Sequence, residues 1–103
     1  MKRTLLTVVF FALLGIVGPT QAAGDAQAGK AKAASCAGCH GANGEGKAPN
    51  PALAGKAESE FVQAMQDYKS GKRANALMKT IAGPLSDQDI ANLAAYYASL
   101  KGK

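Results

Sequence analysis

The chain has little of what many binding and catalytic proteins use. Its 103 residues include one His, two Cys and no Trp, and aromatic residues make up 6%. The short length excludes a large multi-domain enzyme and indicates one small domain. Arg-rich runs and interleaved aromatic stripes are absent, so the formal net charge of +5 gives little support to nucleic-acid binding. No segment alternates apolar and polar residues as a half-buried strand does, and no repeat is visible, so the expected fold class is all-α.

The longest apolar stretch lies near the N-terminus and predicts an export signal. A basic pair precedes an apolar run from Leu5 to Val17, and small residues lead up to Ala22. This order is typical of a secretory signal peptide. The run of 13 residues is shorter than the roughly 20 that cross a bilayer as a helix, which argues against an uncleaved anchor. We expect residues 1–22 to be a cleaved signal peptide and residues 23–103 to form the mature domain.

The mature chain is poor in bulky apolar residues. Apart from Ala and Cys, it offers Leu53, Phe61, Val62, Met65, Tyr68, Leu77, Met78, Ile81, Leu85, Ile90, Leu93, Tyr96, Tyr97 and Leu100. A small domain that is short of core usually needs a metal, a disulfide or another staple. A disulfide between Cys36 and Cys39 would close only a tiny loop and constrain the unfolded chain little. Something else is therefore expected to fill the middle of the domain.

Helical periodicity, N-cap residues and glycine stops predict four helical segments. In chain order they are a helix from about Ala26 to Ser35, a helix from Glu58 to Ser70, a short turn around Asn75 to Ile81, and a last helix from the cap Ser86 through Leu100, with Gly102 beyond its end. The last helix is the clearest, because Asp89 follows the cap three residues on and one face is apolar. The segment from Gly41 to Gly55 holds four Gly and two Pro and is expected to be a loop.

The residues that carry chemistry lie together in Cys36-Ala37-Gly38-Cys39-His40. Two thiols three apart at the end of a helix can lie on one side of it, so both can bond one flat tetrapyrrole while the adjacent imidazole reaches its iron. The pattern is a strong signal for one haem c bound covalently through Cys36 and Cys39. One alternative is a thioredoxin-like redox pair, which would require an adjacent βαβ pattern. The other is a zinc site, which would require further Cys or His ligands.

From Gly24 to Lys103 the chain resembles a small class I cytochrome c of the bacterial, periplasmic type. Besides the attachment motif after an Ala-rich helix, the resemblance rests on Pro51-Ala52-Leu53-Ala54-Gly55, Ser70-Gly71-Lys72-Arg73, Met78, Leu85-Ser86-Asp87 and Ala94-Ala95-Tyr96-Tyr97-Ala98-Ser99-Leu100. It implies the class I cytochrome c fold, with three to five short helices packed around one covalently attached haem and the first and last helices crossing. It also implies that the backbone carbonyl of Pro51 faces the proximal imidazole, and that the protein is periplasmic.

The resemblance further implies a Met opposite His40 on the haem iron, and the mature chain has two. Met65 lies among Phe61 and Tyr68 at helical spacing, which indicates a thioether in the core. Met78 stands 38 residues after His40, in the short segment where the family places its ligand. The expected iron ligands are His40 and Met78, with Met65 as the alternative to Met78.

Two axial ligands would leave no coordination position for a substrate, so the expected function is that of an electron carrier and not of an enzyme. One alternative is a haem enzyme or ligand sensor with an open axial site, such as a peroxidase-like protein, although the chain has no second His. Another is a fixed cytochrome subunit of a larger redox complex. Expected partners are redox proteins such as a terminal oxidase, a reductase or a dehydrogenase, with no nucleic acid and no membrane span in the mature protein. We expect the scattered lysines to form a solvated surface, part of which steers an acidic partner. We expect the protein to be a monomer or a weak dimer.

Overall fold

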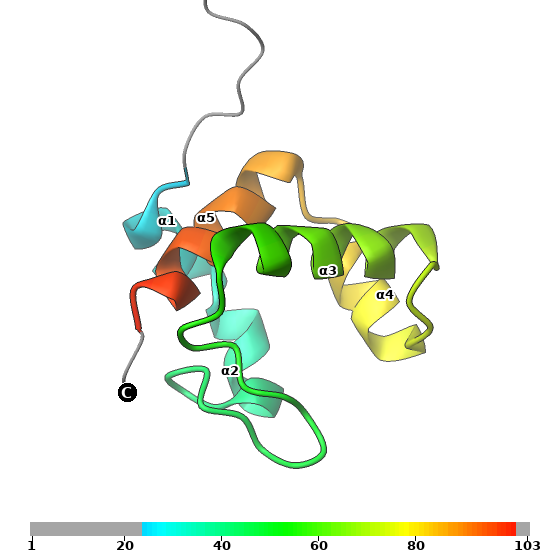
Figure 1. Ribbon diagram of the computed structural model, residues 1–103, viewed down its shortest axis with the longest axis horizontal. Coiled ribbons are helices and arrows are strands. Elements are labelled where there is room, and N and C mark those ends of the chain that lie inside the picture. The colour runs from blue at the N-terminus through cyan, green and yellow to red at the C-terminus, as the bar shows by residue number, and fades with distance from the viewer. Residues whose placement is uncertain (1–23, 101–103) are drawn as a thin grey trace, which may run out of the picture.

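The computed structural model describes residues 24–100, and helices dominate this part of the chain (Figure 1). In chain order they are α1 (Ala26–Lys32), α2 (Ala34–His40), α3 (Glu58–Ser70), α4 (Ala76–Ala82) and α5 (Asp87–Ala98). The described residues contain no strand, so the expected all-α class is confirmed. None of these helices combines the length and the apolar character that a membrane span requires. The expected signal peptide at 1–22 and the expected stop at Gly102 lie outside the described residues.

The Ala-rich segment forms two helices where the sequence predicts one. The first helix ends at Lys32, three residues before the expected end at Ser35, and α2 continues from Ala34 to His40. Between them, the backbone N–H of Ala33 is shared by the carbonyl oxygens of Gly29 and Lys30, at 2.8 and 3.2 Å. Sharing of this kind tightens the last turn of a helix and lets the chain change direction. The prediction of one helix from about Ala26 to Ser35 is therefore wrong, and the two thiols lie inside a second helix, α2.

The other helix ends follow local signals. Asp25 caps α1 by accepting the N–H of Gln27 at 2.9 Å. Ser86 caps α5 by accepting the N–H of Asp89 at 2.9 Å, and the Asp89 carboxylate accepts the Ser86 N–H at 3.0 Å, which completes a capping box. The third helix ends where the sequence predicts, at Gly71, whose positive φ of 87° suits a residue without a Cβ.

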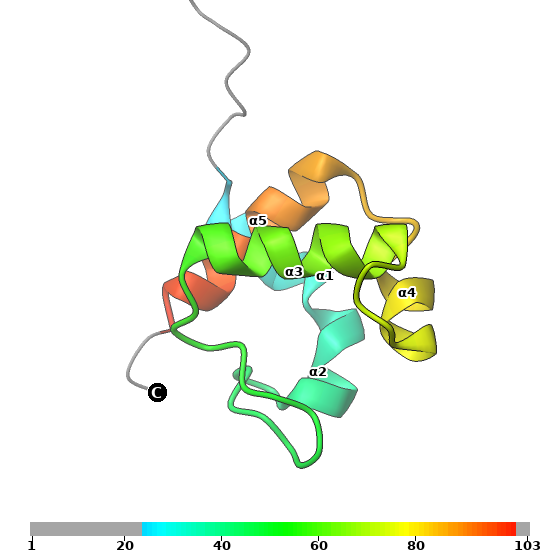
Figure 2. The ribbon, with the colours of Figure 1, turned by 45° about the vertical axis from the view of Figure 1, so that its right-hand side comes forward.

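The helix α5 is the centre of the packing, with α1 and α3 lying against it (Figures 1 and 2). A Cβ built on Gly29 of α1 would stand 2.0 Å from the carbonyl oxygen of Asn92 on α5. The two backbones thus approach closely because residue 29 has no side chain. The contact between the first and last helices that the family resemblance implies is present.

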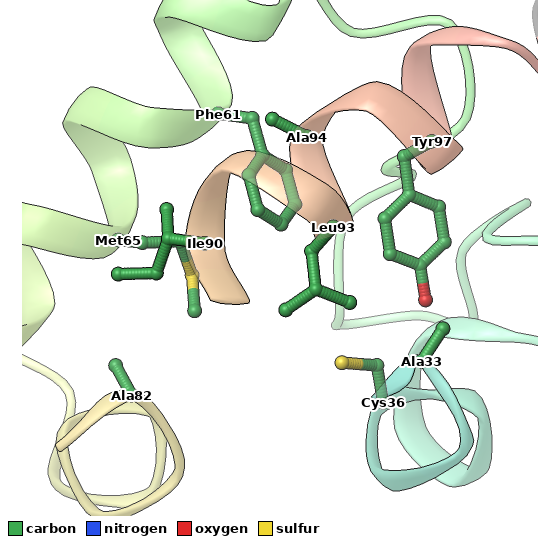
Figure 3. Close-up of a cluster of buried hydrophobic side chains, with 9 residues drawn as sticks. All are labelled: Ala33, Cys36, Phe61, Met65, Ala82, Ile90, Leu93, Ala94 and Tyr97. Carbon is green, nitrogen blue, oxygen red and sulfur yellow. The ribbon is translucent and has the colours of Figure 1, made fainter. Parts of the chain in front are cut away.

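The buried core consists of Ala33, Cys36, Phe61, Met65, Ala82, Ile90, Leu93, Ala94 and Tyr97 (Figure 3). Its largest fully buried side chains, Ile90, Leu93 and Tyr97, come from one face of α5 as the sequence predicts. Leu100 lies just past the end of α5 and is half-buried against this core. The remaining bulky apolar residues are also only partly covered, so the core is as thin as the composition indicates.

The helices α2 and α4 lie outside this central packing. Within residues 24–100, the backbone of α2 comes close to α1 and to no other helix, and the backbone of α4 comes close to α3 and to no other helix. The loop from Gly41 to Ala57 leads from α2 to α3 and stays on the same side of the molecule as α2 (Figure 2). The fold therefore holds α2 and α4 apart, on two sides of one space.

Candidate haem-binding site

A cavity of about 320 Å³ lies between α2, α3, α4 and the loop that precedes α3. All four residues that the sequence predicts to hold a haem line it: Cys36, Cys39, His40 and Met78. The first three come from α2, and Met78 comes from α4 on another wall. Figure 1 shows these two helices as separate segments below α3, with α4 to the right of α2. The tertiary fold thus brings together residues that are 42 positions apart at the extremes, Cys36 and Met78.

The two thiols are both free. Cys36 is buried and Cys39 is exposed, and neither takes part in a disulfide. Because residues three apart on a helix are neighbours on its surface, the two sulfur atoms belong to one face of α2. This face borders the cavity. The pair is therefore available for bonds to one flat ligand.

His40 is the last residue of α2 and is only 7% exposed. Its Nδ1 atom lies 2.7 Å from the carbonyl oxygen of Pro51. Since a carbonyl can only accept, the Nδ1–H must donate, and Nε2 keeps its lone pair. In metal-ligating histidines, a hydrogen bond from the ring nitrogen that does not bind the metal sets the tautomer and the ring orientation. The contact with Pro51 that the family resemblance implies is present in this chain.

The loop that supplies Pro51 is attached to α2 by further hydrogen bonds. Asn50 donates from its side-chain Nδ2 to the carbonyl oxygen of Cys39 at 2.9 Å. Gly46 donates its N–H to the carbonyl oxygen of His40 at 2.6 Å. Sequence analysis did not single out Asn50, although its place next to the proline of the matched Pro51–Gly55 segment was a signal. Its side-chain bond holds the backbone next to Pro51 against the turn of α2 that carries the imidazole.

Tyr97 is a second residue that sequence analysis did not assign to the site. Its ring packs so closely over the loop that a Cβ on Gly44 would stand 2.6 Å from Cε1. Figure 3 shows its side chain extending from α5 toward Cys36 of α2 and toward Ala33, which lies just before α2. Burial, and after it the neighbouring Cys36, raise the pKa of the Tyr97 phenol, so this group stays protonated. The residue helps to hold α2 and the loop on α5.

The two methionines of residues 24–100 both border the cavity but differ in burial. Met65 is 4% exposed and belongs to the core cluster, near Ile90 in Figure 3. This supports the interpretation of Met65 as a core residue. Met78 is half-buried, and its backbone N–H donates to the side-chain Oδ1 of Asn75 at 2.9 Å. Met78 thus packs against the core without being buried in it.

Comparison with known proteins identifies the family. The sequence model of the cytochrome c family matches residues 26–101. The chain belongs to the cytochrome c family. Cytochrome c4 of Pseudomonas aeruginosa is 50% identical over 97 residues, which are 93% of this chain and 48% of that protein. Cytochrome c-554(548) of Halomonas halodenitrificans is 44% identical over 81 residues, which are 75% of this chain and 98% of that protein.

Solved structures agree with the fold. The crystal structure of reduced recombinant cytochrome c4 from Pseudomonas stutzeri matches with a TM-score of 0.72 and 42% identity, over 79% of this chain and 48% of that chain. The class I cytochrome c fold expected from the sequence is therefore confirmed. This cytochrome c spans about half the length of the cytochrome c4 relatives that it matches.

The residues of this cytochrome c fit the covalent haem c that its family implies. The cavity offers two free thiols on one face of α2, an imidazole whose Nε2 carries the free lone pair, and a thioether. The walls between them are mostly apolar, with Leu53, Phe61 and Ile81 among their residues. The described residues contain no group of three or more His, Cys, Asp or Glu that could hold a metal ion, which leaves the zinc alternative without ligands. They also lack the strands that a thioredoxin-like βαβ unit requires.

Proposed function

We propose that this cytochrome c is a mobile electron carrier, with one haem c attached through Cys36 and Cys39 and with His40 and Met78 as axial iron ligands. When bound, the haem supplies an iron that takes up and gives back one electron. The observation that carries the proposal is the arrangement of the cavity: the thiols and a pre-oriented imidazole on α2 share it with a thioether on another wall.

Each ligand has a distinct part in this proposal. The bond from His40 Nδ1–H to the Pro51 carbonyl makes the imidazole a better donor and keeps its ring in one orientation. A soft thioether such as that of Met78 favours the reduced metal and raises the reduction potential. The apolar walls limit the access of water, which lowers the reorganisation that accompanies a change of charge.

The lining argues for electron transfer over substrate chemistry. With His40 and Met78 both on the iron, no position remains for dioxygen or peroxide. A peroxidase-like enzyme would also need a distal group that accepts and returns protons. No second His and no carboxylate is among the described residues that line the cavity. The haem enzyme or ligand sensor therefore remains the weaker alternative, and we propose that the protein is not an enzyme.

The proposal extends to the location and the partners. Residues 1–22 are proposed to be a cleaved signal peptide and residues 23–103 the cytochrome c domain, working in the periplasm as a monomer or weak dimer. Its partners would be redox proteins, such as a terminal oxidase, a reductase or a dehydrogenase. A fixed cytochrome subunit is the second alternative, and tight stoichiometric copurification with one larger complex would favour it over the mobile carrier.

Optical spectroscopy of the exported protein tests the ligand set. The oxidised protein should show the charge-transfer band characteristic of methionine sulfur on ferric iron, and the reduced protein should bind carbon monoxide poorly. Met78→Ala should abolish the band, open the iron to carbon monoxide and lower the reduction potential. Met65→Leu is the matched control and should keep the band. The reverse pattern would assign the ligand to Met65, and ready carbon monoxide binding by the wild-type protein would favour the open-site alternative.

A further inference from the structure

The helix α4, which carries Met78, is the least embedded part of the site. Of its seven residues only Ala82, the last, is buried, and among the described helices only α3 packs against it. Leu77, next to Met78, is 57% exposed. Packing therefore buries the C-terminal end of α4 and leaves most of its first turn exposed. Met78, in that first turn, packs against the core but is only half-buried, so hydrogen bonds of the turn must also hold its position.

The side chain of Asn75 supplies that support. Asn75 stands in an extended conformation just before α4, and its Oδ1 accepts the backbone N–H of Met78 at 2.9 Å. Its carbonyl oxygen accepts the N–H of Lys79 at 2.9 Å, the first hydrogen bond of the helix. Asn75 also lines the cavity, together with Met78. One residue thus starts α4, holds the backbone of Met78 and borders the haem cavity.

The segment that leads from α3 to Asn75 is tied to α3. In the segment between the two helices, the N–H of Arg73 donates to the carbonyl oxygen of Asp67 at 3.1 Å. The guanidinium of the same arginine lies 5.1 Å from the centre of the Tyr68 ring. At the far end of α4, Lys69 donates from Nζ to the carbonyl oxygen of Leu85 at 2.6 Å. The segments before and after α4 are thus both bonded to α3. The segment before α4 contains Asn75, whose side chain bonds to the backbone of Met78.

We propose that Asn75 is the positioning residue for the Met78 ligand, setting the balance between the state in which Met78 binds the iron and the state in which it is released. This inference rests on the proposed ligation by Met78. Release of Met78 is expected to be accompanied by fraying of the first turn of α4. The Asn75 cap opposes that fraying and so disfavours the released state. Loss of an N-cap typically shifts the local equilibrium about fivefold. Removal of the Asn75 side chain should therefore raise the released fraction by that factor.

The experiment compares two helix caps that use the same type of bond. Asn75→Ala removes the cap of α4, and Asn75→Ser keeps a good capping oxygen. Ser86→Ala is the matched control, because it removes the cap of α5, a side-chain acceptor for an N–H 2.9 Å away, from a helix that carries no proposed ligand. Added imidazole is the probe, since it can bind ferric iron only when Met78 is off, and its apparent affinity scales with the released fraction.

Asn75→Ala is expected to bind imidazole about fivefold more tightly than the wild type, whereas Asn75→Ser and Ser86→Ala stay near the wild-type affinity. Hydrogen exchange of the Met78 amide should quicken in Asn75→Ala alone. Equal imidazole affinities for Asn75→Ala and Ser86→Ala would overturn the inference, because they would show only general destabilisation. A Met78→Leu variant separates this failure from a failure of the proposed function. If that variant binds imidazole no better than the wild type, Met78 is not the ligand and both proposals are wrong.

Discussion

The imidazole Nδ1 of His40 lies 2.7 Å from the carbonyl oxygen of Pro51, although 11 positions separate the two residues in the chain. This bond decides which ring nitrogen has a free lone pair. It exists because the Gly-rich loop turns back under α2, where Asn50 and Gly46 donate to the carbonyl oxygens of Cys39 and His40. A local sequence motif thus depends on a loop for its coordination chemistry.

Removal of the Asn50 side chain should weaken this arrangement. Asn50→Ala loses the bond to the Cys39 carbonyl and should lower the free energy of unfolding by about 1 kcal/mol. A looser Pro51 segment should also make His40 a poorer donor, which favours the reduced iron and raises the reduction potential. Asn43→Ala is the control, since Asn43 is an exposed residue of the same loop. Denaturant titration and potentiometry check both effects, and equal behaviour of the two variants would refute this role for Asn50.

The second prediction is that haem attachment decides folding. Cys36→Ala combined with Cys39→Ala should leave a largely unfolded, protease-sensitive chain, because the backbone of α2 comes close to α1 alone among the described helices and the core is thin. Circular dichroism and limited proteolysis measure this. A cooperative thermal transition of the haem-free variant near the wild-type temperature would show that the chain folds without its cofactor.

Two glycines should respond in opposite ways to the same substitution. Gly29→Ala places a Cβ 2.0 Å from the backbone oxygen of Asn92 and should destabilise the protein by about 3 kcal/mol, since neither backbone can yield cheaply. Gly38→Ala meets nothing within 4 Å and should leave stability unchanged or raise it by about 0.5–1 kcal/mol through the lower entropy of the unfolded chain. Thermal unfolding of both variants tests the contrast, which disappears if Gly29→Ala is tolerated.

The capping box of α5 predicts a particular dependence on pH. The backbone N–H of Ser86 donates to the Asp89 carboxylate and holds the pKa of that group below its usual value. A lowered folded-state pKa contributes stability above the unfolded-state pKa, and this contribution is lost as the pH falls below about 4. Asp89→Asn should therefore be less stable than the wild type near neutral pH, and the gap should narrow in acid. Melting temperatures of both proteins from neutral pH to below about pH 4 test this prediction. A difference in melting temperature that does not change with pH would contradict it.

The surface around the cavity should govern encounters with redox partners. Lys56 lines the cavity, whereas Lys30 lies exposed on α1 away from that lining. Lys56→Glu should slow association with an acidic partner by about tenfold at low ionic strength, with little change in reduction potential. Lys30→Glu should have a much smaller effect. Stopped-flow rates over a salt series measure both, and equal rates for the two variants would indicate that docking occurs elsewhere.

Prediction from the sequence works best where a signal is local. The bounds of α3 are correct because acidic residues in the first turn and Gly71 after the last one act within a single helix. The break at Ala33 is missed because a run of Ala-rich residues has the same helix propensity on both sides of it. Asn50 and Asn75 were not assigned roles beside the haem residues, because their bonds to the carbonyl of Cys39 and the N–H of Met78 depend on how the loops return to the helices.

The sequence by itself determined the chemistry available to this protein: two thiols and an imidazole whose spacing on a helix is set by covalent geometry, and helix caps that act over three residues. The family resemblance added the choice of Met78. Helical spacing indicated that Met65 lies in the core, and the resemblance implied the contact between Pro51 and His40; the structure shows both. Only the tertiary structure decided that α2 and α4 stand apart around a cavity, that Asn50 bonds to the carbonyl of Cys39, and that Asn75 caps the helix of Met78. These features join residues far apart in the chain, so they follow from the packing of α1 and α3 on α5 and from the path of the loops, which no local pattern encodes.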